Sequence, residues 1–109
     1  MNQGALYCAL GSFELDEAIY QDSDKFFVDD WRQTESAHDI KPLISRGVIT
    51  AQNLTGELAD VVAGRIPGRT AASETIVVRT EGMAVQDIAL AHWTWRAARD
   101  AGMITTIPL

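Results

Sequence analysis

The segment Thr75-Ile76-Val77-Val78-Arg79, followed by Thr80-Glu81-Gly82 and then by Met83-Ala84-Val85-Gln86-Asp87-Ile88-Ala89, decides the fold of this chain of 109 residues. Its first part is rich in β-branched residues and predicts a strand, whereas the part after Gly82 predicts a helix. In open α/β proteins, ligands bind outside the carboxyl ends of strands, where the N–H groups of a helix N-terminus can hold an anion. The segment therefore indicates an α/β fold with a nucleotide or substrate crevice beside this turn.

A strand, a helix and a second strand are expected upstream. The continuous apolar run Ala5–Leu10 predicts a strand buried on both faces, which Gly11 and Ser12 end. Leu15–Gln21 predicts a short helix with acidic residues in its first turn, and Lys25–Val28 predicts a second buried strand. This spacing favours a right-handed, parallel βαβ unit.

The middle of the chain carries weaker signals. A loop-rich region is expected after the second strand, with a short helical turn around Leu43–Arg46. A helix is expected from about Thr55 to Ala63, and Gly64 is its natural stop. Pro67 and Gly68 then predict a turn.

The last two elements complete one domain, residues 1–109. Glu74–Arg79 predicts the third strand, and a long helix is expected from about Met83 to Ala101, with Gly102 as its stop. The predicted fold class is α/β: a truncated doubly wound, Rossmann-like parallel sheet of about three strands with flanking helices and a long C-terminal helix.

Composition narrows the functional classes. The net charge is -6 and the nine basic residues are scattered, which argues against nucleic-acid and anionic-membrane surfaces. No segment approaches the roughly 20 consecutive apolar residues of a membrane helix, and the start lacks the basic region of a signal peptide. The single Cys8 cannot form an internal disulfide. We therefore expect a cytoplasmic location.

The long helix has an unusually wide apolar arc. Trp93 and Trp95 lie on its opposite flanks, and the polar stripe between them is narrow. One interpretation is a deeply buried core helix. The other is a helix that packs on its own sheet and also on a partner chain. Asp87 falls in the first turn of this helix, where the main expectation is that it stabilises the turn after Gly82.

Other polar clusters favour structural interpretations. Ser36, His38 and Asp39 are expected to decorate a solvated loop, and Cys8 is expected to be inert packing in a buried strand. His38 and His92 are the only histidines and have no ligand partners at helical spacing, so no metal site is expected.

The dinucleotide-binding fingerprint Gly-x-Gly-x-x-Gly is missing. Gly11 stands alone after its strand, with Phe13 and Glu14 where a backbone should approach a pyrophosphate. Asp29 is therefore not interpreted as the ribose-binding acid of such a motif. The pair Asp29-Asp30 instead favours a turn at the strand end, with a role in lining a crevice as the alternative.

Several blocks of the sequence, in order, resemble the ornithine cyclodeaminase/mu-crystallin family. They are Ala9–Asp16, Val28–Gln33, Asp39–Leu43, Glu57–Gly64, Pro67–Arg69 and the strand and helix start at Thr75–Ala89. The resemblance covers nearly the whole chain but only the C-terminal portion of family members. It implies the later strands of a dinucleotide-binding fold, with the glycine fingerprint upstream.

The resemblance also implies a cofactor and site residues. The family uses NAD or NADP, and its backbone contact to the nicotinamide side falls at Ala9, Leu10 and Gly11. A second cofactor contact falls at Thr80, Glu81 and Gly82. The place of the catalytic aspartate of ornithine cyclodeaminases falls at Ser12, and a hydroxyl cannot act as a carboxylate base. This replacement favours imine reduction or amino-acid dehydrogenation over deamination.

Two functional classes follow. One is a fragment or subunit of an NAD(P)-dependent oxidoreductase acting on amino acids or imines, inactive alone and without tight cofactor binding. The other is a non-catalytic remnant that associates with itself or with a longer homologue. In the family, the C-terminal helix and the tail, here Ile104–Leu109, join an N-terminal dimerisation platform. Because that platform is absent here, we expect the helix and tail to pair with a second copy in a homodimer.

Overall fold

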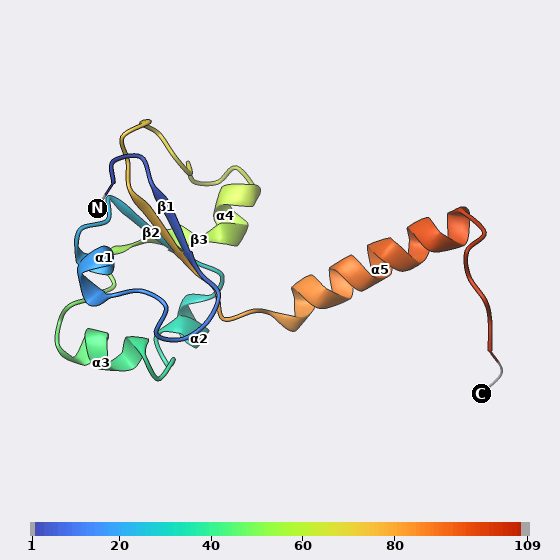
Figure 1. Cartoon of the computed structure of the whole chain (residues 1–109), viewed down its shortest axis with the longest axis horizontal. Coiled ribbons are helices and arrows are strands. Elements are labelled where there is room, and N and C mark those ends of the chain that lie inside the picture. Colours follow the sequence, from blue (N-terminus) through green and yellow to red (C-terminus); the bar gives the residue numbers. More distant parts are fainter. Residues whose placement is uncertain (1, 108–109) are drawn as a thin grey trace.

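The computed structural model describes residues 2–107 and shows a parallel sheet with short flanking helices, from which one long helix leads away (Figure 1). Pro108 and Leu109 of the predicted dimerisation tail lie outside the described residues. In chain order, the elements are β1 (Leu6–Ala9), α1 (Glu17–Gln21), β2 (Lys25–Val28), α2 (Trp31–Thr34), α3 (Ile40–Ser45), β3 (Leu54–Glu57), α4 (Leu58–Val62), β4 (Ile76–Arg79) and α5 (Ala84–Asp100).

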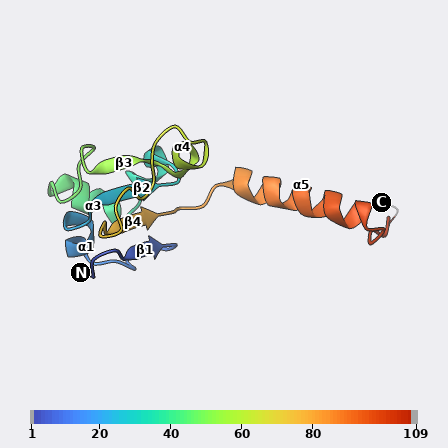
Figure 2. The ribbon, with the colours of Figure 1, turned by 90° about the horizontal axis from the view of Figure 1, so that it is seen from above.

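The sheet has four strands in the order β1-β4-β2-β3, and every neighbouring pair is parallel (Figure 2). The predicted α/β class with a parallel sheet is therefore confirmed. β4 lies between β1 and β2, so the β1–α1–β2 connection passes over one strand. Arg79 at the end of β4 pairs in register with Ala9 and with Val28, so three strands end together.

The core lies on β2 and β4, the two inner strands. Phe26 and Val28 of β2 and Val77 of β4 are almost fully buried, together with Ile40 and Ile49. Tyr20 of α1 packs edge-on against Phe26, with ring centroids 5.5 Å apart. The prediction of a buried strand at Lys25–Val28 is confirmed with the same bounds.

The prediction that the first strand is buried on both faces is wrong. β1 is an edge strand with β4 as its single neighbour, and its first residue, Leu6, and Leu10 directly after it are 58% and 75% exposed. Cys8 is also exposed, so it is not the buried packing residue that the apolar run suggested. Among the described residues, only Ala9 of this strand is buried.

The helix expected from Thr55 to Ala63 is wrong in its first half, which forms β3. Pairing with β2 overrides the local pattern, since the Thr55 hydroxyl accepts the N–H of Phe26 at 3.0 Å where the register shifts. Gly56 suits this strand because the side chain of Ile66 fills the space of a Cβ. α4 follows, and Gly64 ends it with φ 70° as predicted.

The long helix was predicted within one residue at each end, but the expectation common to both interpretations, that it packs on its own sheet, is wrong. α5 is exposed along its length and leads away from the sheet (Figures 1 and 2), with Trp93 and Trp95 68% and 50% exposed. The backbone turns at Gly82, where φ is 84°, and directs the helix outward. No helix within residues 2–107 is long and apolar enough to cross a membrane.

Candidate functional site

The loops after β1 and β4 converge at the carboxyl edge of the sheet. Because the two strands pair, the Thr80 N–H donates to the Ala9 carbonyl at 3.0 Å, and the Thr80 hydroxyl lies 3.5 Å from the same oxygen. The two sets of predicted cofactor-facing residues therefore lie side by side: Ala9, Leu10 and Gly11 on one loop, Thr80, Glu81 and Gly82 on the other. This edge is where open α/β folds bind ligands.

A buried carboxylate holds the turn that precedes α5. Asp29, only 2% exposed, accepts the N–H groups of Glu81 and Gly82 on Oδ2, at 2.9 and 2.8 Å. Its Oδ1 accepts the Asp30 N–H at 2.9 Å, and Asp30 in turn caps α2 by accepting the Gln33 N–H at 2.9 Å. The turn-forming interpretation of Asp29-Asp30 is thereby supported for both residues.

Asp29, and not Asp87 as expected, stabilises the turn after Gly82. Asp87 is exposed in the first turn of α5, and its side chain makes no hydrogen bond to the residues that the structure describes. A carboxylate at the end of β2 reaches the turn after Gly82 because β2 and β4 are neighbours. Sequence alone could not place two residues so far apart beside each other.

Arg79, the last residue of β4, is fully buried and joins both loops. Its Nε donates to Glu81 at 2.8 Å, one terminal nitrogen donates to Asp39 at 3.3 Å, and the other donates to the Gly11 carbonyl. A buried guanidinium requires such partners, because an unpaired charge in the interior is costly. Burial of Tyr20 itself raises the pKa of its hydroxyl, and the positive charge of Arg79 opposes that rise.

Asp39 is buried, contrary to its predicted place in a solvated loop. Its Oδ1 faces Arg79, and its Oδ2 accepts the Phe13 N–H at 2.9 Å. Ser36 and His38 are exposed, as expected, and the His38 ring lies edge-on to Phe13. The signal that sequence reasoning missed is the arginine that ends an otherwise apolar strand, since its burial demands carboxylate partners.

Ser12, the predicted counterpart of the family aspartate, is exposed on the loop that follows β1. Phe13 beside it has φ 60°, an unusual conformation for a residue other than glycine. Glu14 folds back so that its Oε2 accepts the Leu10 N–H at 2.7 Å. Several N–H groups of the converging loops are therefore already bonded to carboxylates of the chain itself.

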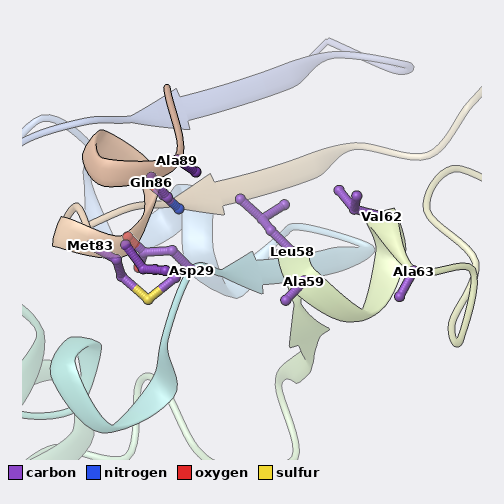
Figure 3. Close-up of a pocket in the computed structure, with 9 residues that line it drawn as sticks. Asp29, Leu58, Ala59, Val62, Ala63, Met83, Gln86 and Ala89 are labelled. Carbon is purple, nitrogen blue, oxygen red and sulfur yellow. The ribbon is translucent and has the colours of Figure 1, made fainter. Parts of the chain in front are cut away.

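An open, mainly apolar pocket of about 710 Å³ lies beside this edge (Figure 3). Leu58 and Val62 of α4 lie on one side of it, and Met83 and Gln86 near the start of α5 lie on the other. Asp29 contributes a buried carboxylate to its lining, so the second interpretation of this residue also holds. A crevice beside the turn before α5 was predicted, but the wall formed by α4 was not, because the two walls come from segments that meet only in the fold.

A parallel sheet of this order, with a helix start beside the ends of its strands, defines a Rossmann-like domain. The family model of the ornithine cyclodeaminase/mu-crystallin family matches residues 2–101. The chain belongs to this family.

Relatives carry the same domain within longer chains. A Staphylococcus aureus N-((2S)-2-amino-2-carboxyethyl)-L-glutamate dehydrogenase is 30% identical over 110 residues, covering 100% of this chain and 33% of the relative. The structure of Thermococcus litoralis Δ(1)-pyrroline-2-carboxylate reductase with NADH and L-proline is similar with a TM-score of 0.86 and 26% identity, over 98% of this chain and 35% of that one.

A second solved structure, a dimeric archaeal alanine dehydrogenase with bound NAD, has a TM-score of 0.80 and 26% identity, over 100% of this chain and 35% of that one. The chain thus spans about a third of the length of the relatives it matches.

Proposed function

We propose that this chain is the cofactor-facing C-terminal part of an NAD(P)-dependent oxidoreductase that acts on an amino acid or an imine, and that it is inactive alone. The observation that carries the proposal is the convergence of the loops after β1 and β4 at the carboxyl edge of the sheet. Family membership supports it, as does the NADH and L-proline complex of the Thermococcus litoralis relative.

Backbone groups of the two loops would face the nicotinamide side of the cofactor. The N–H groups of Leu10, Glu81 and Gly82 are bonded to Glu14 and Asp29, whereas the Leu10 carbonyl accepts no hydrogen bond from the described residues. A free carbonyl suits the amide N–H groups of a nicotinamide carboxamide. The pyrophosphate would be held elsewhere, by the glycine fingerprint that this chain lacks.

The charge of Glu81 is partly offset at this site, because Glu81 shares the Arg79 guanidinium with Asp39. A carboxylate beside a phosphate would repel it, but the Glu81 side chain pairs with buried Arg79 at 2.8 Å. The bound cofactor would supply or accept a hydride. Ser12, exposed on the β1–α1 loop, would orient substrate by hydrogen bonding, since its hydroxyl does not act as a base at neutral pH. Imine reduction and amino-acid dehydrogenation are therefore favoured over deamination.

The chain alone is expected to bind NADH and NADPH weakly, because the glycine fingerprint that holds a pyrophosphate is missing. Titration of either cofactor, followed by nicotinamide fluorescence, should show no saturation below about 1 mM. A dissociation constant in the low micromolar range would contradict this expectation.

A second candidate function is non-catalytic association with a copy of itself or with a longer homologue. The observation that favours it is the exposure of large apolar side chains along α5, among them Ile88, Leu90, Trp93 and Trp95. We propose a homodimer through this helix, a role also supported by the dimeric archaeal relative. The relatives are metabolic enzymes by name, which supports a cytoplasmic location.

A further inference from the structure

Three hydrogen bonds fasten the β1–α1 loop, residues 10–14, in one conformation. The Leu10 N–H is bonded to Glu14 within the loop, whereas the other two bonds come from distant parts of the chain. Arg79 of β4 donates to the Gly11 carbonyl, and Asp39 at the start of α3 accepts the Phe13 N–H at 2.9 Å. These two contacts lie immediately before and immediately after Ser12.

The conformation that they hold is strained. Phe13 has φ 60°, and its side chain is 74% exposed, so burial of the ring does not offset the cost of a left-handed backbone. Strained residues persist only where their surroundings fix them, and they are concentrated at functional sites. The contacts from Arg79 and Asp39 are the long-range interactions that fix this residue and its neighbours.

Arg79 and Asp39 also form an ion pair with each other, so that their two contacts with the loop are coupled. The Arg79 guanidinium lies 3.3 Å from Asp39, with side chains 1% and 6% exposed, and it also contacts Glu81 on the other converging loop. A buried ion pair is often no more stabilising than well-packed apolar residues of similar volume. Stability alone therefore does not explain why charges occupy these positions.

We propose that Arg79 and Asp39 are positioning residues, which fix the β1–α1 loop so that Gly11 and Ser12 present one defined surface to the ligand. The ligand part of this inference rests on the function proposed above, but the fixing of the loop is testable without any ligand. Arg79 acts through the Gly11 carbonyl and Asp39 acts through the Phe13 N–H.

The test is amide hydrogen exchange and ¹⁵N relaxation of the whole chain, comparing the wild type with Asp39→Ala. This variant leaves Arg79 paired with Glu81. We expect the Phe13 amide to exchange at least ~10-fold faster and the loop amides to become mobile, while the core amides of Phe26 and Val77 change much less. Equal acceleration of loop and core amides, or an unchanged Phe13 amide, would overturn the proposal.

A double variant, Arg79→Met with Asp39→Leu, separates positioning from stability. It replaces the ion pair with apolar side chains, so core exchange should stay near the wild-type rate while the loop remains mobile. A loop as protected as in the wild type would contradict the proposal. Arg46→Met is the matched control, because it removes an exposed ion pair with Glu17 on the neighbouring helices and should leave the loop unchanged.

No ligand is present in these experiments. If the loop is fixed but nicotinamide mononucleotide at up to ~20 mM shifts none of its amides, the proposed function is refuted and the positioning role stays intact.

Discussion

At the scale of single residues, the site is built from side-chain carboxylates that bind backbone N–H groups. Asp29 accepts two N–H groups of the turn before α5. Asp39 accepts the N–H of Phe13, and Glu14 accepts the N–H of Leu10. These bonds occupy donors that an anionic ligand would otherwise use. The chain therefore has few free N–H groups at this edge, which suits the nicotinamide end of a cofactor better than its anionic pyrophosphate.

Asp29→Ala should lower the free energy of unfolding by about 3 kcal/mol, because it leaves the N–H groups of Glu81 and Gly82 without their acceptor in a part-buried site. Asp30→Ala is the matched neighbour and removes only the cap of α2, at a cost of about 1 kcal/mol. Urea unfolding followed by circular dichroism measures both. Equal losses of unfolding free energy for the two variants would show that the Asp29 hydrogen bonds contribute no more to stability than the cap made by Asp30.

Glu74 should make stability depend on pH in the acid range. Hydrogen bonds from the Thr70 hydroxyl and N–H, assisted by Lys25, lower the pKa of Glu74 from 4.5 to about 2. A lowered folded-state pKa means that the stabilisation is complete above pH 4.5 and is lost as the pH falls from 4.5 towards 2.

Glu74→Gln should therefore be less stable than the wild type at neutral pH and should lose less stability across this acid window. Urea unfolding at several pH values measures the difference. Thr70→Val removes the largest cause of the pKa shift and should flatten the same dependence. Parallel pH profiles for the wild type and both variants would contradict the assigned contacts.

Residue-level predictions succeeded where the signal was local. Gly64 and Gly102 stop their helices at left-handed φ values, and the predicted cofactor-facing residues lie together because the two strands that precede them, β1 and β4, were both predicted and pair with each other. Arg79 and Asp39 were missed, since they are 40 positions apart and meet only when β4 enters the sheet. A hydrophobic pattern does not report such pairings.

At the scale of elements, strand pairing determines some secondary structure that the periodicity of the sequence does not predict. The sequence predicted β1, β2, β4 and the long helix, each of which has a strong apolar pattern or a glycine boundary. It assigned β3 to a helix, because Leu54–Glu57 is a short segment that becomes a strand through its contact with β2. Burial also depends on pairing, and β1 is exposed because it lies at the sheet edge.

Self-association should occur through α5. Trp93→Glu adds a charge to an exposed apolar surface and should shift the chain toward monomer in sedimentation equilibrium, with far-UV circular dichroism unchanged because Trp93 is 68% exposed. His92→Glu adds the same charge on the exposed polar stripe of the helix and serves as the control. A wild-type chain that is monomeric at about 100 μM, or a Trp93→Glu variant that remains dimeric, would contradict the proposed interface.

At the scale of the whole molecule, the chain combines a sheet domain with a helix that leads away from it, in a structure 55 Å long (Figure 1). The family and the parallel sheet were predicted from ordered sequence blocks, and both are confirmed. The packing of α5 was not predicted. A wide apolar arc indicates that a helix packs on another surface, but it does not tell whether that surface is its own sheet. The chain spans about a third of its relatives, and its exposed helix and sheet edge fit that relationship.

The most direct test of the site is a titration with nicotinamide mononucleotide, which lacks the second nucleotide, followed residue by residue in ¹H–¹⁵N NMR spectra. At concentrations up to ~20 mM, we expect weak binding, with shifts confined to the amides of Leu10, Gly11, Glu81 and Gly82. Adenosine monophosphate, which carries a phosphate but no nicotinamide, should leave these amides unchanged. Shifts confined to other parts of the chain, or none at all, would contradict a cofactor-facing edge formed by the loops after β1 and β4.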